Sequence, residues 1–246
     1  MTSQPLLGKS ALVTGGARRI GREIALVLAR AGADLTITWR SSQADATETI
    51  RAIEDLGRRA LAVECDVRQE MSVKAAVAAS LSFHGRLDVL VNNAAVFESS
   101  ALDTISLEQW DAVFETNARG PFLVAREALA ALRASEGRIV NIGSLGGLEA
   151  WAGHGHYCSS KAALHMLTKA MAKSFAPEVS VNCVAPGWIE MDEAEETAAV
   201  AVRFAARTPM QRNGTANDVA QAVEFFACGP RFVTGQILTV DGGLGL

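Results

Sequence analysis

Short apolar runs alternate with longer helical patterns along the whole chain, and this alternation limits the fold most strongly. The seven runs are "ALVTG", "DLTITW", "ALAVECD", "LDVLVNNA", "GRIVNIGS", "VSVNCVAPG" and "QILTVDGG". Each is nearly continuous in apolar residues, as expected for strands buried on both faces. Stretches such as "RRIGREIALVLARAG" instead carry apolar residues at helical spacing and end at a glycine. With right-handed crossovers, the pattern predicts an α/β fold: a doubly wound parallel sheet of about seven strands with helices on both faces.

The chain is expected to form one domain over residues 1–246, because no Pro/Ser-rich or charge-run linker interrupts it. Its 49% hydrophobic and 20% charged residues provide enough material for one core. The formal net charge of -4 gives no basic footprint, so we expect no nucleic-acid partner. The sequence "MTSQPLLGKSALVTGG" lacks a cationic segment followed by a long apolar run, and no apolar stretch reaches about 18 residues. We therefore expect no membrane association and a cytoplasmic location.

The cysteines and histidines give little sign of a metal or disulfide site. Cys65, Cys158, Cys183 and Cys228 lie far apart without a C-x-x-C motif, so we expect reduced thiols. His154 and His156 form an H-x-H pair, but no cluster supplies a third ligand at a usual spacing. We expect no metal.

The first strand is followed by the turn "TGGARRIG", residues 14–21. Gly15 would allow a tight turn and Gly21 a close approach of the next helix, which brings backbone N–H groups toward a pyrophosphate. A glycine turn alone is weak evidence, but its position between a strand and a helix favours dinucleotide binding over a purely structural turn.

The end of the second predicted strand indicates which dinucleotide binds. NAD sites usually place Asp or Glu there to bind the ribose hydroxyls. Here the strand ends in "TWRSS", so Arg40 and Ser41 occupy that place, and Arg18 or Arg19 of the glycine turn could join them. Cationic donors match a 2′-phosphate, so we predict NADP(H); the alternative is that these arginines are solvated surface charges.

The only tyrosine of the chain, Tyr157, precedes Lys161 by one helical turn, and Ser144 ends the strand before them. A phenol has a pKa near 10, and a nearby ammonium favours the phenolate. We therefore predict a lowered pKa, which would let Tyr157 act as general acid or base for a carbonyl. Ser144 would hold the substrate oxygen. Taken alone, the spacing of Tyr157 and Lys161 would favour a helix surface pair, because Y-x-x-x-K occurs easily by chance.

Eight motifs occur in one order along the chain: "TGGARRIG", "CDV", "NNAA", the Asn of "ETNARGPF", Ser144, "YCSSK", "APG" and "TGQILTVDGG". In this order the chain resembles the short-chain dehydrogenase/reductase family from end to end, including members similar to 3-oxoacyl-[acyl-carrier-protein] reductases and to pteridine reductases. The resemblance implies a single Rossmann-like domain that binds a nicotinamide cofactor.

The resemblance also implies a catalytic set of Asn117, Ser144, Tyr157 and Lys161. In the family's scheme Tyr157 donates the proton and Ser144 positions the carbonyl. Lys161 holds the nicotinamide ribose, and Asn117 keeps a water that links Lys161 to solvent.

Further cofactor contacts follow from the resemblance. It places Asp66 and Val67 at the adenine and Asn93 and Ala94 at the adenosine ribose, and it places Pro186 and Gly187 at the nicotinamide. Together with the residues argued above, the predicted cofactor-binding set is Gly15, Arg18, Arg19, Ile20, Arg40, Ser41, Asp66, Val67, Asn93, Ala94, Tyr157, Lys161, Pro186, Gly187 and Ile189.

Two departures from the family pattern affect this set. A second glycine of the turn is replaced by Arg19, a feature shared with enzymes that resemble pteridine reductases. A threonine that commonly contacts the carboxamide is replaced by Met191, so we expect that contact from backbone near Ile189 or not at all. Cofactor affinity is the quantity that these departures put in question.

Substrate choice is expected to rest on a lid around 188–212, as the family uses this segment. Its first half carries Glu190, Asp192, Glu193, Glu195 and Glu196. Such a run is typical of a solvated helix N-terminus. If it faces the entrance instead, it would disfavour a strongly acidic carrier protein.

Three aromatic residues, Phe97, Trp151 and Trp188, are expected near the substrate cleft, where they would favour a flat or apolar substrate; they could equally cover the core. Phe97 and Arg19 resemble pteridine reductases, whereas those enzymes typically carry Asp at the position of Ser144. We therefore place an NADPH-dependent carbonyl or 3-oxoacyl reductase first and a pteridine reductase second.

A function of another class, an NADP-binding regulator or scaffold without turnover, also remains open. The intact catalytic set argues against it. The resemblance further implies a homotetramer that uses the helices around 106–132 and 157–175 and the C-terminal strand. The apolar residues Leu164, Leu167 and Met171 could serve that interface or be buried within one subunit.

Overall fold

A computed structural model describes residues 4–190 and 195–246. Within these residues one seven-stranded sheet forms, with the order β3-β2-β1-β4-β5-β6-β7 and every pairing parallel. The predicted α/β fold class is confirmed. The strands are β1 Ser10–Val13, β2 Asp34–Trp39, β3 Ala60–Glu64, β4 Val89–Asn92, β5 Arg138–Ile142, β6 Ser180–Pro186 and β7 Ile237–Val240.

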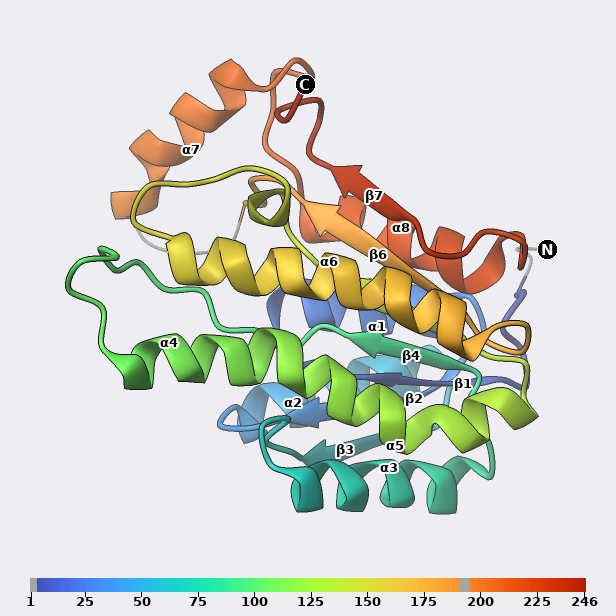
Figure 1. Ribbon diagram of the computed structural model, residues 1–246. Helices are drawn as coiled ribbons and strands as arrows, with labels where there is room; N and C mark the ends of the chain where they lie inside the picture. The colour runs from blue at the N-terminus through green and yellow to red at the C-terminus, as the bar shows by residue number, and fades with distance from the viewer. Residues whose placement is uncertain (1–3, 191–194) are drawn as a thin grey trace.

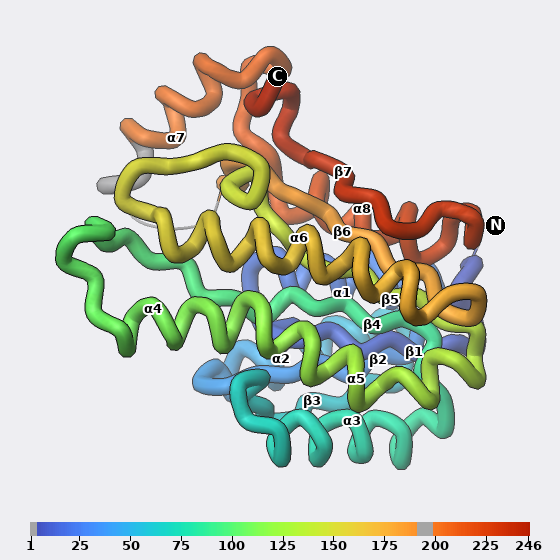
Figure 2. Tube along the Cα trace, viewed as in Figure 1, coloured from blue at the N-terminus to red at the C-terminus, as the bar shows by residue number. Residues whose placement is uncertain are grey.

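Helices cover both faces of this sheet (Figures 1 and 2). On one face α1 packs between α2 and α8, while on the other α3 packs against α5, and α6 lies on β6. The helices are α1 Arg19–Arg30, α2 Gln43–Asp55, α3 Glu70–His84, α4 Leu107–Phe114, α5 Gly120–Ala134, α6 Gly155–Phe175, α7 Glu195–Arg207 and α8 Ala216–Cys228. A π-helical turn, η1 Glu115–Arg119, joins α4 to α5, and a short 3₁₀ turn, η2 Leu145–Gly147, follows β5.

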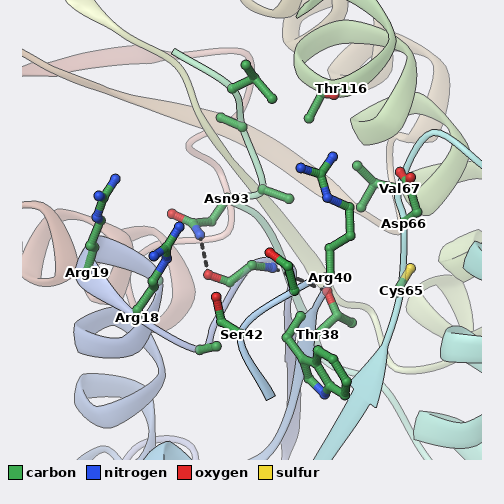
Figure 3. Close-up of a pocket in the computed structure, with 18 of the residues that line it drawn as sticks. Arg18, Arg19, Thr38, Arg40, Ser42, Cys65, Asp66, Val67, Asn93 and Thr116 are labelled. Atoms are coloured by element: carbon green, nitrogen blue, oxygen red, sulfur yellow. Dashed lines mark hydrogen bonds between the residues drawn. The ribbon is translucent and has the colours of Figure 1, made fainter. Parts of the chain in front are cut away.

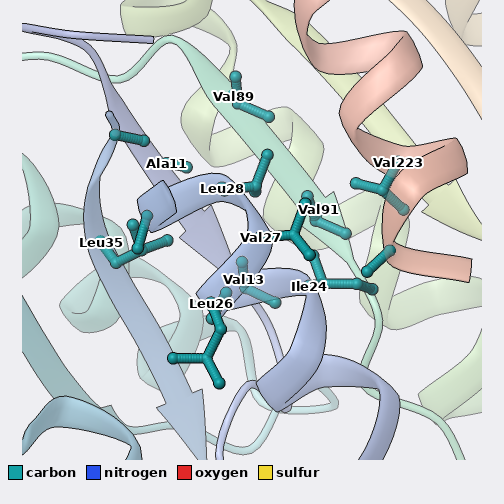
Figure 4. Close-up of a cluster of buried hydrophobic side chains, with 14 of the residues drawn as sticks. Ala11, Val13, Ile24, Leu26, Val27, Leu28, Leu35, Val89, Val91 and Val223 are labelled. Atoms are coloured by element: carbon teal, nitrogen blue, oxygen red, sulfur yellow. The ribbon is translucent and has the colours of Figure 1, made fainter. Parts of the chain in front are cut away.

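A hydrophobic cluster on each face fixes the sheet between the helices. In Figure 4, Ile24, Val27 and Leu28 of α1 lie against Val91 of β4, and Val223 of α8 lies beside them. Ile24 and Leu28 are fully buried. The second cluster, on the opposite face, includes Leu90, Val124 and Ile139. Strands buried on both faces explain why their sequences are almost continuously apolar.

The order of the strands reverses beside β1, since β2 pairs with one edge of β1 and β4 with the other. At such a switch point the loops that leave the two strands diverge and open a crevice at the carboxyl ends. The glycine turn after β1 therefore lies at the edge of this crevice.

Asn117 lies in η1, the π-helical turn that separates α4 from α5. Ser106 begins α4 with a capping box, because its side chain accepts from the Gln109 N–H at 3.2 Å while Gln109 bonds back to Ser106 N. Pro121 lies in the first turn of α5. The π-turn adds one residue between them, a feature often found at functional sites.

In the residues that the structure describes, no helix combines the length and apolar character that a membrane crossing requires. Helix α7 stands apart from the sheet layers, at the upper left of Figure 1. It begins at Glu195, and the predicted residues Met191, Asp192 and Glu193 lie outside the described part of the chain.

Candidate active site

The turn after β1 is built from glycines that leave no room for side chains. Gly15 has a φ of +64°, which favours glycine. A Cβ at Gly21 would meet the carbonyl oxygen of Gly15 and the side-chain amide of Asn93. The helix α1 therefore approaches the turn as closely as backbone allows, as a pyrophosphate cradle requires.

Thr14 and Asn93 connect this turn to the end of β4. The hydroxyl of Thr14 accepts from the N–H groups of Asn93 and Ala94 at 3.0 and 3.1 Å. The Asn93 amide in turn donates to the carbonyls of Thr14 and Gly15 at 2.9 and 3.0 Å. These bonds hold the two strand ends at a fixed separation across the switch point.

A cavity of about 290 Å³ opens between these strand ends, and ten of the fifteen predicted cofactor residues line it (Figure 3). Those ten are Gly15, Arg18, Arg19, Ile20, Arg40, Ser41, Asp66, Val67, Asn93 and Ala94. Lining residues that sequence reasoning missed include Thr38, Trp39, Ser42 and Thr116. Thr38 could have been suspected from its place two residues before Arg40. Its hydroxyl accepts from the Gly15 N–H at 3.2 Å.

Arg18 and Arg19 rise from one side of the cavity and Arg40 from the other, with Asn93 between them (Figure 3). All three arginines are exposed at this rim. Asp66 is held by Arg68, whose Nη2 lies 2.6 Å from Oδ2. The hydrogen bond from Arg68 holds the pKa of Asp66 below its ordinary value, and the charge of Arg40 acts in the same direction.

Arg19 takes the left-handed conformation that the replaced glycine would adopt without strain, since its φ is 53°. For a residue with a Cβ this conformation costs about 1–2 kcal/mol. Burial, and secondarily the charge of Arg18, lowers the pKa of Arg19. Arg19 therefore keeps the backbone conformation of the glycine turn and adds a positive charge at its rim.

The remaining predicted cofactor residues lie outside the lining of this cavity, at β6 and α6. Pro186 ends β6 and pairs with Val240, and Gly187 donates to the Val240 carbonyl at 3.0 Å. Ile189 forms an isolated bridge with Gly214 and packs on the core.

Tyr157 and Lys161 are both buried, on the first turns of α6. The Lys161 side chain is 2% exposed, and its Nζ donates to the Ile142 carbonyl at 2.8 Å. It also lies 5.8 Å from the centroid of the Tyr157 ring. Burial lowers the pKa of Lys161 from 10.5 to about 8. The pair is therefore part of the interior, and the alternative of a helix surface pair is wrong.

Burial raises the pKa of Tyr157 to about 12, although a hydrogen bond with Ser144 acts in the opposite direction. This direction is opposite to the lowered pKa predicted from the sequence, because desolvation of the phenolate dominates in the chain by itself. The phenol therefore holds its proton at neutral pH. Ser144 follows β5 and is buried, and its Oγ accepts from the Gly146 N–H at 3.1 Å.

Asn117 sits in the π-turn η1, where its side chain binds the loop after β4. Its Oδ1 accepts from the Val96 N–H at 2.8 Å, and its Nδ2 donates to the Val96 carbonyl at 2.9 Å. The same Nδ2 donates to Ser160 Oγ at 3.1 Å. Ser160 donates to the Tyr157 carbonyl at 2.7 Å. Asn117 thus connects the β4 loop with the helix that carries Tyr157.

Two of the three predicted substrate-pocket residues contact Tyr157. Phe97 meets its ring edge to face, with centroids 4.8 Å apart, and Trp151 lies nearly parallel to it at 6.3 Å. Trp188 stacks on Phe204 of α7 at 4.4 Å. The Tyr157 ring therefore lies between aromatic side chains, and Trp188 connects the exit of β6 to α7.

His165 and Cys183 lie beside Gly143, the residue before Ser144. Sequence reasoning did not single them out for the site. Side chains at Gly143 would meet both His165 and Cys183. Burial, and secondarily the charge of Lys161, lowers the pKa of His165 to about 4. Burial raises the pKa of Cys183 to about 12. Both groups are therefore neutral near Lys161, whose ammonium remains the local charge.

All four cysteines are free thiols, as expected. Among the described residues, no group of three or more His, Cys, Asp or Glu side chains is arranged to hold a metal ion. His154 and His156 instead contact the loop after β4.

The arrangement fits a nicotinamide dinucleotide with a 2′-phosphate. The turn from Gly15 to Gly21 presents bare backbone, and no carboxylate stands at the end of β2, where Arg40 does. Outside the lining of this cavity, α6 and the loop after β5 offer a protonated phenol, a buried ammonium and a serine hydroxyl. That combination can donate a proton to a substrate oxygen and stabilise the charge left behind.

Comparison with known proteins agrees with this geometry. The family model described as "Enoyl-(Acyl carrier protein) reductase" matches residues 15–245. The 3-oxoacyl-[acyl-carrier-protein] reductase FabG of Staphylococcus aureus is 35% identical over 240 residues, which cover 96% of this chain and 98% of that protein.

Two solved structures with bound cofactor are similar throughout. A blue fluorescent protein from a metagenomic library, in complex with NADPH, has a TM-score of 0.93 and 36% identity, and the match covers 99% of this chain and all of that one. A short chain dehydrogenase from Burkholderia cenocepacia, in complex with NADP, has a TM-score of 0.93 and 39% identity over 98% of this chain and 100% of its own.

Proposed function

Because the chain belongs to the short-chain dehydrogenase/reductase family and is an NADP(H)-dependent oxidoreductase, we propose that it reduces a carbonyl to an alcohol with Tyr157 as the general acid. The observation that carries the proposal is the buried Tyr157 phenol, which is hydrogen-bonded to Ser144 and whose ring centroid lies 5.8 Å from Lys161 Nζ. A 3-oxoacyl group or a related ketone is the proposed substrate class, as in the FabG relative.

In this proposal the cofactor lies along the cavity of the glycine turn. Arg40, Ser41 and the arginines of the turn hold its 2′-phosphate, Asp66 and Val67 border the adenine, and Asn93 and Ala94 border the ribose. Tyr157, Lys161, Pro186, Gly187 and Ile189 hold its nicotinamide end. When bound, NADPH supplies the hydride for the carbonyl carbon.

The residues of the chain handle the proton. Ser144 Oγ binds the carbonyl oxygen, and the Tyr157 hydroxyl donates its proton to that oxygen as it gains charge. The Lys161 ammonium then stabilises the phenolate. Reduction uses Tyr157 in its protonated form, which burial favours.

The lid around 188–212 is proposed to comprise α7 and its flanks. Trp188 stacks on Phe204, so a movement of α7 would carry an aromatic side chain beside the exit of β6. Glu190 is exposed, and its N–H donates to the Gly214 carbonyl at 2.8 Å. These contacts hold the described flanks of the proposed lid together beside the exit of β6.

We also propose that the chain acts as one domain that assembles into a homotetramer. Leu164 and Met171 are buried within the subunit, so they are not available for an interface. Exposed apolar side chains on the same and neighbouring elements, Phe122, Met166, Phe225 and Leu238, are better candidates. Sedimentation that finds only monomer would contradict the tetramer.

The proposed function is tested by NADPH oxidation with acetoacetyl-CoA, ethyl acetoacetate, 1-phenyl-1,2-propanedione and dihydrobiopterin. We expect turnover of at least one ketone, and a fall of about 10² to 10⁴ in kcat in Tyr157→Phe, which should still bind NADPH through the remaining cofactor contacts. Turnover of dihydrobiopterin alone would select the pteridine reductase, which Phe97 at the Tyr157 ring supports. NADPH binding without turnover of any probe would select the scaffold.

A further inference from the structure

The loop after β4 is joined to the start of α6 by four successive contacts that run in opposite chain directions. Phe97 packs on Tyr157 with centroids 4.8 Å apart. Next along the loop, Glu98 Oε1 lies 3.5 Å from His156 Nε2. Ser99 Oγ then lies 2.8 Å from His154 Nε2, and the Ser100 N–H donates to the Gly153 carbonyl at 2.8 Å. The H-x-H pair thus binds a loop.

The contact between Glu98 and His156 differs from the others because it is buried. The His156 side chain is 0% exposed, and neither of its ring nitrogens has a hydrogen-bond partner among the described residues. The same holds for Glu98 Oε1, although the Glu98 side chain as a whole is 35% exposed. Buried polar atoms without partners are costly, so these two groups have strong reason to remain together.

The site described above gives this pair no role. Both of its residues are nevertheless sequence neighbours of Tyr157 or of the side chain that packs on it. His156 immediately precedes Tyr157, and Glu98 immediately follows Phe97. Phe97 also stacks on His154 at 4.9 Å, so the loop side chain is held between the helix start and the phenol.

We propose that Glu98 and His156 are positioning residues that hold the 97–100 segment against α6 and thereby fix Tyr157 and Phe97 relative to the substrate carbonyl. The inference rests on the proposed function, in which Tyr157 donates the proton. Nε2 of His156 carries a proton toward Glu98 both in the charged ring and in the Nε2–H tautomer of the neutral ring, so the contact does not require an ion pair.

The consequence for the reaction is geometric. Loss of the pair frees Phe97 from one side of the Tyr157 ring, and a misplacement of about 1 Å can cost about 10²-fold in rate. An interaction that matters only for alignment in the transition state lowers kcat while KM changes little.

The test uses the single tyrosine as a site-specific reporter. In protein labelled with 3-fluorotyrosine, the one ¹⁹F resonance reports the environment of Tyr157 without any turnover. In parallel, kcat and KM are measured with NADPH and 1-phenyl-1,2-propanedione for Glu98→Ala, Glu98→Gln, His156→Leu and the double variant Glu98→Ala/His156→Leu.

We expect Glu98→Ala and His156→Leu each to shift or broaden the resonance and to lower kcat about tenfold with KM within about twofold. Glu98→Gln keeps an acceptor and should restore both readouts. The double variant should be no worse than either single variant, because both remove one shared contact. His84→Leu is the control, since His84 is a partly buried histidine that, like His156, has an unpartnered Nδ1, and it is located beside Thr36.

Several results would overturn the inference. These are an unchanged resonance and kcat in Glu98→Ala, additive losses in the double variant, or an equal effect of His84→Leu. If His156→Leu fails to fold, Glu98→Ala at its partly exposed loop position still decides the question. If the unsubstituted protein turns over no ketone, the proposed function fails, while the resonance still reports whether the pair positions Tyr157.

Discussion

The proposed cofactor end and the proposed catalytic end of the site are built by different physical means. At the cofactor end, exposed arginines stand on backbone that glycines and Thr14 hold in place, so the charges remain in contact with solvent. At the catalytic end, Tyr157 and Lys161 are buried and their protonation equilibria are displaced by desolvation. The first region offers charge that a ligand can reach, whereas the second holds ionisable groups in an environment that disfavours their charged forms.

The largest expected effect is at the catalytic end. Ser144→Ala removes the hydroxyl proposed to bind the carbonyl oxygen, and loss of one such donor lowers kcat by about 10² to 10³. Steady-state rates of NADPH oxidation with 1-phenyl-1,2-propanedione measure it. NADPH affinity should stay within about twofold; a matching loss of affinity would show that Ser144 serves the cofactor site instead.

At the cofactor end, Arg40→Asp should weaken NADPH binding by about 10- to 100-fold, because charge-assisted hydrogen bonds contribute about 1.5–3 kcal/mol and are replaced by repulsion. Nicotinamide fluorescence titrations with NADPH and NADH measure the difference, and NADH should be affected much less. Arg51→Asp, at an exposed position on α2 outside the cavity lining, makes the same charge change as a control. Equal losses for the two cofactors would remove the 2′-phosphate assignment.

The pH dependence of reduction should distinguish the two ends. Lys161 is cationic below its lowered pKa of about 8, so kcat/KM should be level near neutral pH and fall about tenfold per unit above that value. The measurement is a pH series of reduction rates with NADPH affinity determined at each point. A level profile up to pH 10 would mean that the Lys161 charge is not needed.

The smallest effect concerns stability without cofactor. The shift of Lys161 from 10.5 to about 8 corresponds to about 3 kcal/mol of unfavourable ionisation. Lys161→Met relieves this but leaves the Ile142 carbonyl without its donor, so we expect a net gain of about 1 kcal/mol, or about 2–4 °C in Tm. Thermal unfolding at neutral pH measures it.

The same variant has a second signature. Because the folded pKa of Lys161 lies below its unfolded value, this group makes the stability of the unsubstituted protein rise between about pH 8 and 10. Lys161→Met should lose that rise. A lower Tm together with an unchanged pH slope would show that the hydrogen bond to Ile142 outweighs the desolvation of the ammonium.

The sequence predicted the sheet and the glycine turn well because both depend on local patterns. Continuous apolar runs implied buried strands, and glycines at fixed spacing implied the turn at Gly15. The state of Tyr157 could not be predicted in the same way. Its pKa depends on how deeply α6 is buried and on the loop that brings Phe97 to its ring, and both are set by packing between distant segments. The role of His156 was missed because its partner Glu98 lies far away in sequence.

The π-turn at Glu115–Arg119 has one more consequence. A helix advances about 100° per residue, so the extra residue changes the direction in which α4 faces relative to α5. Deleting one residue there would restore regular winding and rotate every side chain of α4 by that angle, moving Val113 out of the interior. Length variation at this point should therefore be far less tolerated than substitution.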